Sequence, residues 1–178
     1  MTKFISSTQV SEIHLTKPFI NMRSYNKKIL EFLSQKEFEE NLTTINELPV
    51  QKTINALFSF LSSTDKNIKE NAILAMGEIV SGMAENDYES AKDIMRRLVW
   101  SLNEESGWIG WGSAETMAEI MVRNERLAKD FHKMLISYIS EGENYLLFEE
   151  LRKEVFKALK RLGKVRPELV DEVSEIIN

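Results

Sequence analysis

The sequence predicts an all-α protein in which pairs of antiparallel helices stack into an α-α superhelix. Three observations support this fold class. Apolar residues recur at three- and four-residue steps, which is helical spacing. The 178 residues include only seven glycines and three prolines, so few positions interrupt a helix. Similar segments also return after about 41 residues, and we therefore expect a right-handed solenoid of about four helix pairs behind an N-terminal arm.

Four apolar stripes mark the helix faces that a core buries. They consist of Ile68, Ala72, Met76, Ile79 and Met83; Ile94, Leu98 and Leu102; Leu127, Phe131, Leu135 and Tyr138; and Phe148, Leu151, Val155, Leu159 and Leu162. The whole pattern predicts helices over 27–34, 36–47, 50–62, 65–84, 88–103, 112–124, 127–140, 147–162 and 167–177. Asp65 and Asp87 are placed to cap two helix starts, and Gly142 and Gly163 to end two helices in a left-handed conformation.

The internal repeat determines how the helices are expected to pack. Residues 75–79 (AMGEI) align with 116–120 (TMAEI) at an offset of 41, and 158–162 (ALKRL) follow 42 residues later. The partner helices agree, because 57–61 (LFSFL) align with 98–102 (LVWSL) at an offset of 41. A period near 40 made of two helices is typical of stacked repeat arrays. Since one pair cannot bury its apolar stripe alone, neighbouring pairs must cover one another.

We expect residues 1–26 to form an N-terminal arm and residues 27–178 to form one helical repeat domain. The arm is rich in Ser, Thr and β-branched residues, has no helical stripe, and contains Lys17-Pro18, which favours an extended backbone. The sequence has no cysteine, no apolar run long enough for a membrane span and no export signal at its start. These features predict a cytoplasmic protein without disulfides.

Charge is unevenly distributed along the chain. The net charge is −5, but residues 152–166 contain seven basic side chains and one acidic side chain. This stretch therefore carries +6 and the remainder −11. A basic side of one helix is usually its solvated face. The acidic balance argues against a general nucleic-acid binder, because such proteins neutralise phosphates with Lys and Arg.

The segment over residues 67–79 (NIKENAILAMGEI) resembles the first helix of the HEAT-repeat superfamily, in particular of the PBS-lyase HEAT-like repeats. The resemblance covers roughly residues 50–178. It implies the α-solenoid fold, but the superfamily includes lyase subunits, hydroxylases, repair glycosylases and adaptors, so the fold alone does not identify a function.

Three catalytic branches of this superfamily imply different chemistry. The deoxyhypusine hydroxylase type resembles a metal enzyme built on His-Glu pairs, and here His14 and His132 are followed by Leu and Lys, which excludes it. Phycobilin lyases have similar repeats but imply a tetrapyrrole, for which no residue stands out. Alkylpurine DNA glycosylases carry Trp, Asp and Arg on a concave surface; Arg96-Arg97 near Trp100 fits that pattern, while the acidic segment 103–105 (NEE) opposes it.

Residues 100–119 (WSLNEESGWIGWGSAETMAE) interrupt the regular pattern. They hold all three tryptophans and three of the seven glycines. Gly107, Gly110 and Gly112 give a backbone free to adopt positive φ, which predicts a structured turn. Trp108 and Trp111 then either present their rings to a partner, as at interaction hot spots, or fill the gap between two repeats.

The carboxylates of this segment also have two interpretations. Glu115 and Glu119 lie one helical turn apart, so together with Glu104 or Glu105 they make a possible cation site. The alternative is that they pair with Arg96, Arg97 or Arg123, or stabilise the start of the 112–124 helix. No nucleotide-binding loop, nucleophile elbow or zinc-protease motif is present.

The sequence therefore predicts a non-catalytic binding or scaffold module that recognises a protein or a cofactor-bearing partner through residues 100–119. The candidate contact residues are Arg96, Trp100, Asn103, Glu104, Glu105, Trp108, Trp111, Glu115 and Glu119. We expect no catalytic residue, no metal and no resident cofactor, and neither a nucleic acid nor a membrane as partner. Two alternatives stay open: a DNA-acting enzyme of the alkylpurine glycosylase kind, and an accessory protein, similar to a lyase or chaperone, for a cofactor-dependent enzyme.

Overall fold

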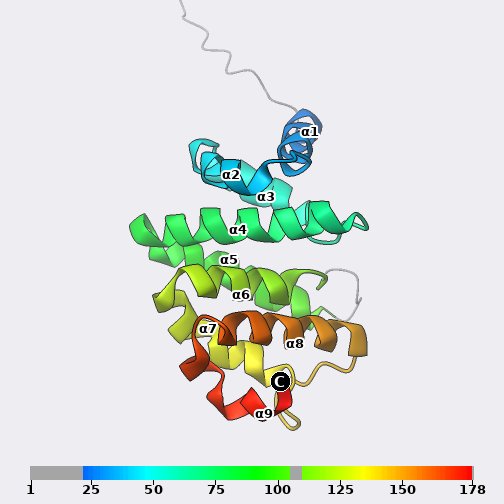
Figure 1. Cartoon of the computed structure of the whole chain (residues 1–178), viewed down its shortest axis with the longest axis vertical. Coiled ribbons are helices and arrows are strands. Elements are labelled where there is room, and N and C mark those ends of the chain that lie inside the picture. Colours follow the sequence, from blue (N-terminus) through cyan, green and yellow to red (C-terminus); the bar gives the residue numbers. More distant parts are fainter. Residues whose placement is uncertain (1–21, 105–109, 178) are drawn as a thin grey trace, which may run out of the picture.

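The computed structural model describes residues 22–104 and 110–177, and every regular element in these two ranges is helical (Figure 1). The α-helices are α1 (Met22–Leu33), α2 (Phe38–Asn41), α3 (Val50–Phe60), α4 (Lys66–Asn86), α5 (Tyr88–Asn103), α6 (Ser113–Arg123), α7 (Glu125–Ser137), α8 (Glu149–Gly163) and α9 (Ser174–Ile177). Three short 3₁₀ helices join them: η1 (Leu42–Glu47), η2 (Pro167–Leu169) and η3 (Asp171–Val173). None of the described helices has the length and apolar character needed to cross a membrane.

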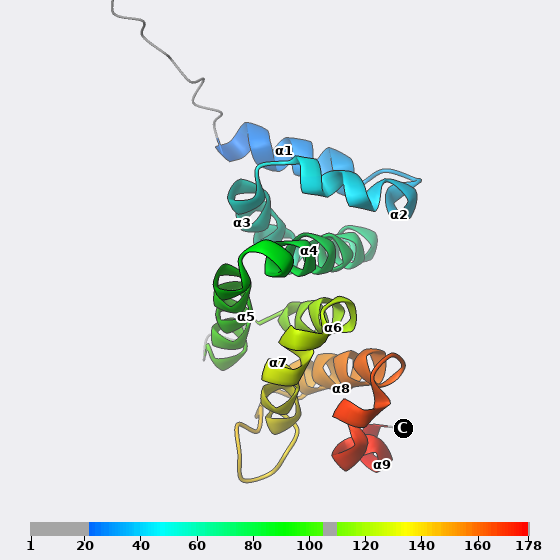
Figure 2. The same ribbon diagram turned by 90° about the vertical axis from the view of Figure 1, so that its left-hand side faces the viewer.

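The helices form two layers. In Figure 1, α4, α6 and α8 lie one below the other and run in the same direction, with α5 and α7 behind them. Figure 2, turned by 90°, shows α4, α6 and α8 in one layer and α3, α5 and α7 in the other. Helix α6 packs against both α4 and α8 and is the centre of the first layer. Helices α1 and α2 cover one end of the stack, and α9 lies at the other.

The segments that the sequence predicts to be equivalent lie side by side. Helices α4, α6 and α8 contain the three aligned segments 75–79, 116–120 and 158–162. In the described ranges, hydrogen bonds that involve a side chain join four pairs of residues 42 positions apart. They link Asn55 with Arg97, Tyr88 with Asp130, Gly112 with Glu154, and Glu119 with Arg161. The repeat offset seen in the sequence is thus also the spacing at which neighbouring helices touch.

The apolar stripes supply the core that holds the layers together. Met76 and Ile79 of α4, Met117 and Ile120 of α6, and Leu159 of α8 are each at most 1% exposed. Both predicted N-caps are confirmed. Asp65 accepts hydrogen bonds from the amides of Asn67 and Ile68, and Asp87 accepts one from Ser90. These caps fix where α4 and α5 begin, and so fix the register of the residues that follow.

The chain departs from the sequence prediction at both ends. Helix α1 begins at Met22, five residues before the predicted helix and inside the predicted arm of residues 1–26. The reason is a buried stripe, Tyr25, Ile29 and Leu33, whose first member also hydrogen bonds through its hydroxyl to Thr53 at 2.7 Å. Residues 1–21 lie outside the described ranges. The helices predicted over 36–47 and 167–177 are instead each divided between 3₁₀ and short α-helical turns.

Several glycines also differ from the roles that the sequence predicted for them. Gly142 has a φ of +90°, but it lies in a turn beyond the end of α7 rather than directly at a helix end. Gly163 is the last residue of α8 and is not left-handed; a Cβ there would approach Val170 at 2.8 Å, so close packing explains it. Of the predicted turn glycines, Gly112 has a φ of +75° and Gly110 does not adopt positive φ. Gly107 lies outside the described ranges.

Gly77 marks the closest approach of α4 and α6. A Cβ at this position would lie 2.7 Å from Cγ of Glu119 and 3.1 Å from Nε of Arg123. The two side chains pair with each other, and Glu119 also pairs with Arg161 of α8, so they have little room to move. Gly82, one and a half turns further along α4, has no comparable neighbour; its nearest atom is Oδ1 of Asn46 at 3.6 Å.

This pair of glycines provides a matched test of the packing. Gly82→Ala should raise the free energy of unfolding by about 1 kcal/mol, because alanine is the better helix former. Gly77→Ala gains the same propensity but overpacks the α4/α6 contact, which costs about 1–3 kcal/mol. We therefore expect Gly77→Ala to be the less stable variant in urea unfolding followed by circular dichroism. Equal stabilities would contradict the close approach of α4 and α6.

Candidate functional site

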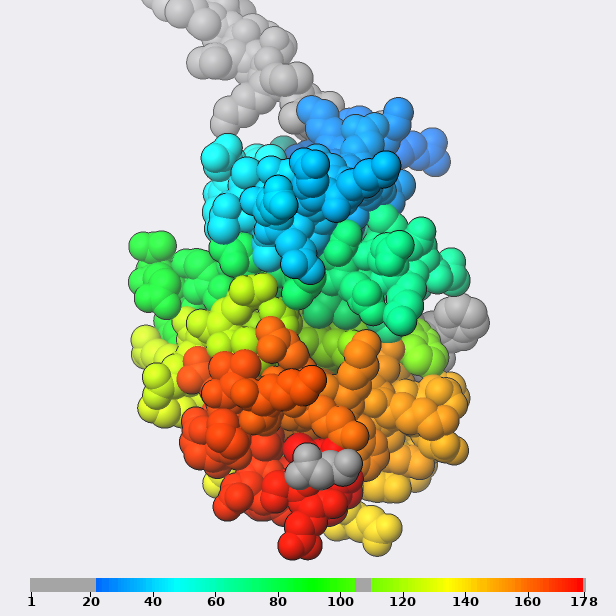
Figure 3. All heavy atoms as spheres, in the orientation of Figure 1, coloured from blue at the N-terminus to red at the C-terminus, as the bar shows by residue number. Residues whose placement is uncertain are grey.

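The first layer presents a face on the side away from α5 and α7, and this face is hollowed at α6. In Figure 2, α2 and α8 extend further out on this side than α6 does. Figure 3 shows the same face with its side chains. A hollow of about 260 Å³ lies over α6 between α4 and α8. Its lining is Glu70, Ile73 and Leu74 of α4, Glu115 and Glu119 of α6, and Lys157, Ala158 and Arg161 of α8. We call it the α6 hollow.

Glu119 is the most buried acidic side chain at this site, with 4% of its side chain exposed. Its Oε1 lies 2.9 Å from Arg123 one turn further along α6, and its Oε2 accepts a hydrogen bond from Nε of Arg161 at 3.0 Å. A carboxylate removed from water is costly unless charged donors replace the water. The two arginines do this, and Arg161 at the same time joins α8 to α6.

A second group of charges lies one turn nearer the helix starts. Glu115 contacts Lys157 of α8 at 2.5 Å and Lys69 of α4 at 3.8 Å. Lys69 also pairs with Glu154 of α8, whose other oxygen accepts a hydrogen bond from the amide of Gly112 at 2.8 Å. The hydrogen bond to Glu115 raises the pKa of the Lys157 ammonium group. Cations from two helices thus neutralise the carboxylates between them.

The polar contacts continue to the far side of α4. Arg123 lies 3.8 Å from Glu78 of α4, and Glu78 accepts a hydrogen bond from the side-chain amide of Asn46 in η1 at 3.0 Å. The contacts therefore run without a break from η1 across α4 and α6 to α8. Each helix of the layer is tied to the next by side chains rather than by packing alone.

The basic stretch over residues 152–166 is therefore more than a solvated helix face. Lys157 and Arg161 pair with α6, and Arg152 donates to the carbonyls of Leu146 and Leu147. Arg166 donates to the carbonyls of Met121 and Val122 at 2.9 and 3.3 Å, near the end of α6 where carbonyls lack helical partners. These side chains are used to hold α8 and its flanks against the neighbouring helices.

The structure separates the residues that the sequence placed in one contact surface. Glu115 and Glu119 line the α6 hollow, and Trp111 lies at the start of α6. Arg96, Trp100 and Asn103 are exposed residues of α5 in the other layer, and Glu104 is the half-buried residue that directly follows α5. Glu105 and Trp108 lie outside the described ranges.

The predicted pairings are partly confirmed. Arg123 does pair with Glu119, but Arg96 pairs with Asp93 of its own helix and Arg97 donates to Asn55 at 2.8 Å. Arg97 also stacks on the ring of Phe58, 3.8 Å from its centroid. The predicted alternative, a cation site, is not supported by the described residues, which contain no group of three or more carboxylates or histidines arranged to hold a metal ion.

Trp111 belongs to an aromatic edge that we define as Trp111, Leu147 and Phe148. The ring of Trp111 meets that of Phe148 edge to face with centroids 5.9 Å apart, and Nζ of Lys69 lies 5.8 Å from the Trp111 centroid. Trp111 is half-buried, whereas Leu147 is 90% and Phe148 50% exposed. The tryptophan thus packs against Phe148 and also contributes to an apolar surface; its contact with a partner stays a prediction.

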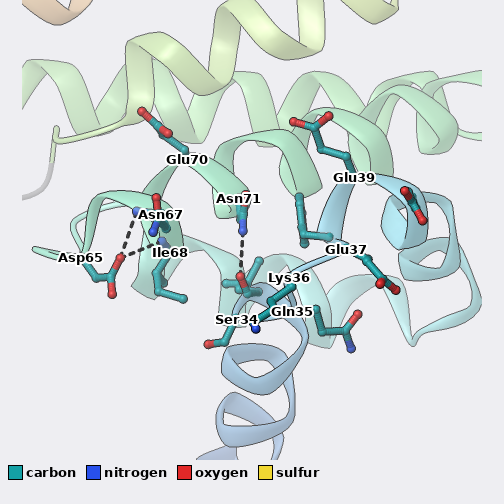
Figure 4. A pocket seen from close by; sticks show the side chains of 13 residues that line it. Ser34, Gln35, Lys36, Glu37, Glu39, Asp65, Asn67, Ile68, Glu70 and Asn71 are labelled. Carbon is teal, nitrogen blue, oxygen red and sulfur yellow. Dashed lines mark hydrogen bonds between the residues drawn. The ribbon is translucent and has the colours of Figure 1, made fainter.

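A second concavity adjoins the hollow, and Figure 4 shows it from close by. It has a volume of about 600 Å³ and lies between the end of α1, α2 and the start of α4. Five carboxylates line it, from Glu37, Glu39, Glu40, Asp65 and Glu70. Asn71 closes its base by donating to the carbonyl of Leu33 at 2.8 Å. We call it the acidic cleft.

Among the residues that line the α6 hollow, only Glu115 and Glu119 were predicted from the sequence. A signal for others was present in the repeat. Adding the repeat offset of 42 to Glu115 and Glu119 gives Lys157 and Arg161, which are the residues that pair with them. The same offset leads from Gly112 to Glu154. Opposite charges at equivalent repeat positions therefore indicate contacts between stacked helices. Comparison with family models, with curated proteins and with solved structures found no match to this chain.

The first test at this site concerns Glu119. Glu119→Gln keeps the shape of the side chain but removes the charge that both arginines contact, so we expect a loss of about 1–3 kcal/mol in the free energy of unfolding. Adding Arg161→Gln should cost less in that background than alone, because the two residues share one interaction. Glu31→Gln, which breaks an exposed pair with Lys27 in α1, is the control and should have little effect. Strict additivity of the Glu119 and Arg161 changes would argue against their contact.

Asn103, although exposed, takes part in a contact with the buried Tyr138, in the layer of α5 and α7. The Tyr138 side chain is fully buried, and its hydroxyl donates to the carbonyl of Val99 at 3.3 Å. Burial raises the pKa of Tyr138 to about 12, and a side-chain hydrogen bond with Asn103 acts in the opposite direction. This tyrosine links the end of α7 to α5.

The raised pKa of Tyr138 predicts a dependence of stability on alkaline pH. In the unfolded chain the phenol ionises near pH 10, but in the folded protein it stays neutral to about pH 12. The unfolded state therefore loses its proton first, and stability should fall as pH rises from 10 to 12. Denaturant unfolding of wild type and Tyr138→Phe across this range should show a shallower fall for the variant. Parallel curves would contradict a buried neutral phenol.

Proposed function

We propose that this chain is a HEAT-like α-solenoid of about four helix pairs that works as a non-catalytic, protein-binding module. The pairs would be α1 with α2 and η1, α3 with α4, α5 with α6, and α7 with α8. The shared spacing of sequence repeats and helix contacts supports the fold assignment. The face of α2, α4, α6 and α8 would be the contact surface.

The α6 hollow is the observation on which the proposed function depends. Its walls carry apolar surface from Ile73, Leu74 and Ala158, while every carboxylate on its α6 side is already neutralised by a cation. Such a concavity stabilises an apolar group by removing it from water, and the surrounding polar groups fix its orientation. No part of the arrangement supplies a nucleophile with an activating base.

The size of the hollow favours a side chain of a protein partner over a cofactor. Sites for cofactor-sized molecules usually have volumes of about 300–1,000 Å³ and enclose most of the ligand. The hollow of about 260 Å³ falls below this range and opens onto a wide face. One large apolar side chain from a partner would fill it, with the flanking residues of that partner lying along α4 and α8.

The aromatic edge would extend this contact surface. Trp111 precedes α6 and Phe148 precedes α8, so both lie at the helix starts of the same layer. Exposed aromatic residues near a concave face are frequent anchors in protein interfaces. The predicted recognition through residues 100–119 thus narrows to Trp111, Glu115 and Glu119, with most of the remaining surface contributed by α4 and α8.

No contact on this face supports either of the two alternative functions. A DNA-acting enzyme needs free basic side chains facing a phosphate backbone, yet Lys157 and Arg161 on this face are paired with carboxylates. An accessory protein for a cofactor-dependent enzyme would be a special case of protein binding. It requires the same contact surface and is separated from the general proposal only by the identity of the partner.

The test places a charge in the hollow and compares it with the same change elsewhere. Leu74→Glu puts a carboxylate beside Glu70, whereas Val50→Glu adds one to the first turn of α3, in the other layer. We expect tagged wild type and Val50→Glu to retain the same binding proteins from the native host, and Leu74→Glu to lose them by at least about tenfold, or 1.4 kcal/mol. Circular dichroism would establish that all three proteins are folded. Retention of the same proteins by folded Leu74→Glu would contradict the proposed contact surface.

A further inference from the structure

The α6 hollow and the acidic cleft are two parts of one surface. Glu70 lines both, and Figure 4 shows its side chain pointing from the cleft toward the ribbon of α6. The two concavities therefore meet across a single turn of α4. A partner segment that places one residue in the hollow and continues past α4 toward α2 must cross the cleft.

The two parts differ in how their charges are satisfied. In the hollow, Glu115 and Glu119 each contact two cations. In the cleft, Glu37, Glu39 and Glu40 form no ion pair with any described residue, and Lys36 is the single base among the described lining residues. The hollow is thus nearly balanced in charge, while the adjoining cleft carries uncompensated negative charge.

We propose that the α6 hollow binds an apolar side chain of a partner protein, and that the stretch of the same partner that crosses α4 toward α2 is basic. This inference rests on the proposed function and specifies the chemistry of its partner. The apolar walls of the hollow select the anchor residue, and the free carboxylates of Glu37, Glu39 and Glu40 select the flanking charge. Complementary potential of this kind determines specificity and association rate more than affinity.

Charge complementarity also argues against two other occupants. A second copy of this chain carries a net charge of −5, so most of its surface would be repelled by the cleft. A nucleic acid would place phosphates against the same free carboxylates. A basic protein segment with an apolar residue at one end satisfies both concavities at once.

The first experiment identifies the preferred sequence directly. A phage-displayed library of random dodecapeptides is selected on the immobilised full-length chain, and the enriched peptides are then tested for binding to folded Leu74→Glu. The expected result is enrichment of peptides in which Lys or Arg residues lie on one side of an apolar residue. The best peptide is then labelled with fluorescein, and its dissociation constant is measured by anisotropy.

The second experiment removes the charge of the cleft. In the triple variant Glu37→Gln, Glu39→Gln and Glu40→Gln, the labelled peptide should bind about three- to tenfold more weakly. Raising the salt concentration from 50 to 500 mM should weaken binding to wild type by a similar factor, because the Debye length falls from about 14 to about 4 Å. The triple variant should lose most of this salt dependence.

A matched control keeps the same net charge change far from the face. Glu141→Gln, Glu168→Gln and Glu175→Gln alter three exposed residues near the other end of the stack that form no ion pair with described residues. This control should bind the peptide as wild type does. An equal loss in both triple variants would mean that overall charge, and not the cleft, attracts the peptide, which would overturn the inference.

The outcomes separate the inference from the function on which it depends. Enrichment of apolar peptides without basic residues, all lost in Leu74→Glu, would overturn the basic partner but leave the hollow as a protein-binding site. Enriched peptides that bind Leu74→Glu as tightly as wild type would overturn both. Enriched acidic peptides would also overturn the inference, because they would require a cation-rich contact.

Discussion

The structure depends on neutralising the carboxylates that lie between three parallel helices. Helix α6 contributes Glu115 and Glu119 to both of its boundaries, and α8 directs Glu154 back toward the start of α6. Such groups are tolerated in a packed layer only when donors from the adjacent helix replace the lost water. The register of the layer follows from this requirement, since Lys69, Lys157 and Arg161 reach their partners only when the three helices are aligned as observed.

The same requirement shapes the surface available for binding. The side chains that hold the helices together also form the rim of the α6 hollow, so the concavity is built from groups with little freedom to reorganise. Pre-organised surfaces lose less entropy on association than flexible ones. The free carboxylates of the acidic cleft lie next to this network, in and just before α2, and form no ion pair with a cation of another described helix. In the proposed binding mode, stability and recognition would therefore use different carboxylates of one face.

Much of the helical layout could be predicted from the sequence, because apolar periodicity and caps are local signals. Helix α5 has its predicted bounds, and Asp65 and Asp87 cap the helices as their positions indicated. The start of α1 at Met22 was missed because Tyr25 is buried through tertiary contacts, among them its hydrogen bond to Thr53 of α3, which local sequence does not reveal. The short 3₁₀ turns near both ends of the chain likewise depend on tertiary contacts.

The site was harder to predict, because it combines residues from three helices that are far apart in sequence. The tryptophans of residues 100–119 are conspicuous by composition, yet Trp100 lies in a different layer from Glu115 and Glu119. Lys157 and Arg161 looked like ordinary solvated bases until their positions were compared with residues 42 places earlier. Pair interactions across a repeat are visible in a sequence only when the repeat is used to align charges as well as apolar residues.

The parallel alignment of the first layer also limits how the chain can change in length. One residue inserted into α6 would rotate everything after it by about 100°, turning Arg123 and Glu119 away from α4 and α8 together. The segment between α7 and α8 is less constrained, since residues 141–144 are all exposed and the segment connects helices of different layers. Natural insertions and deletions should therefore occur mainly in this connection, while α6 keeps its number of residues.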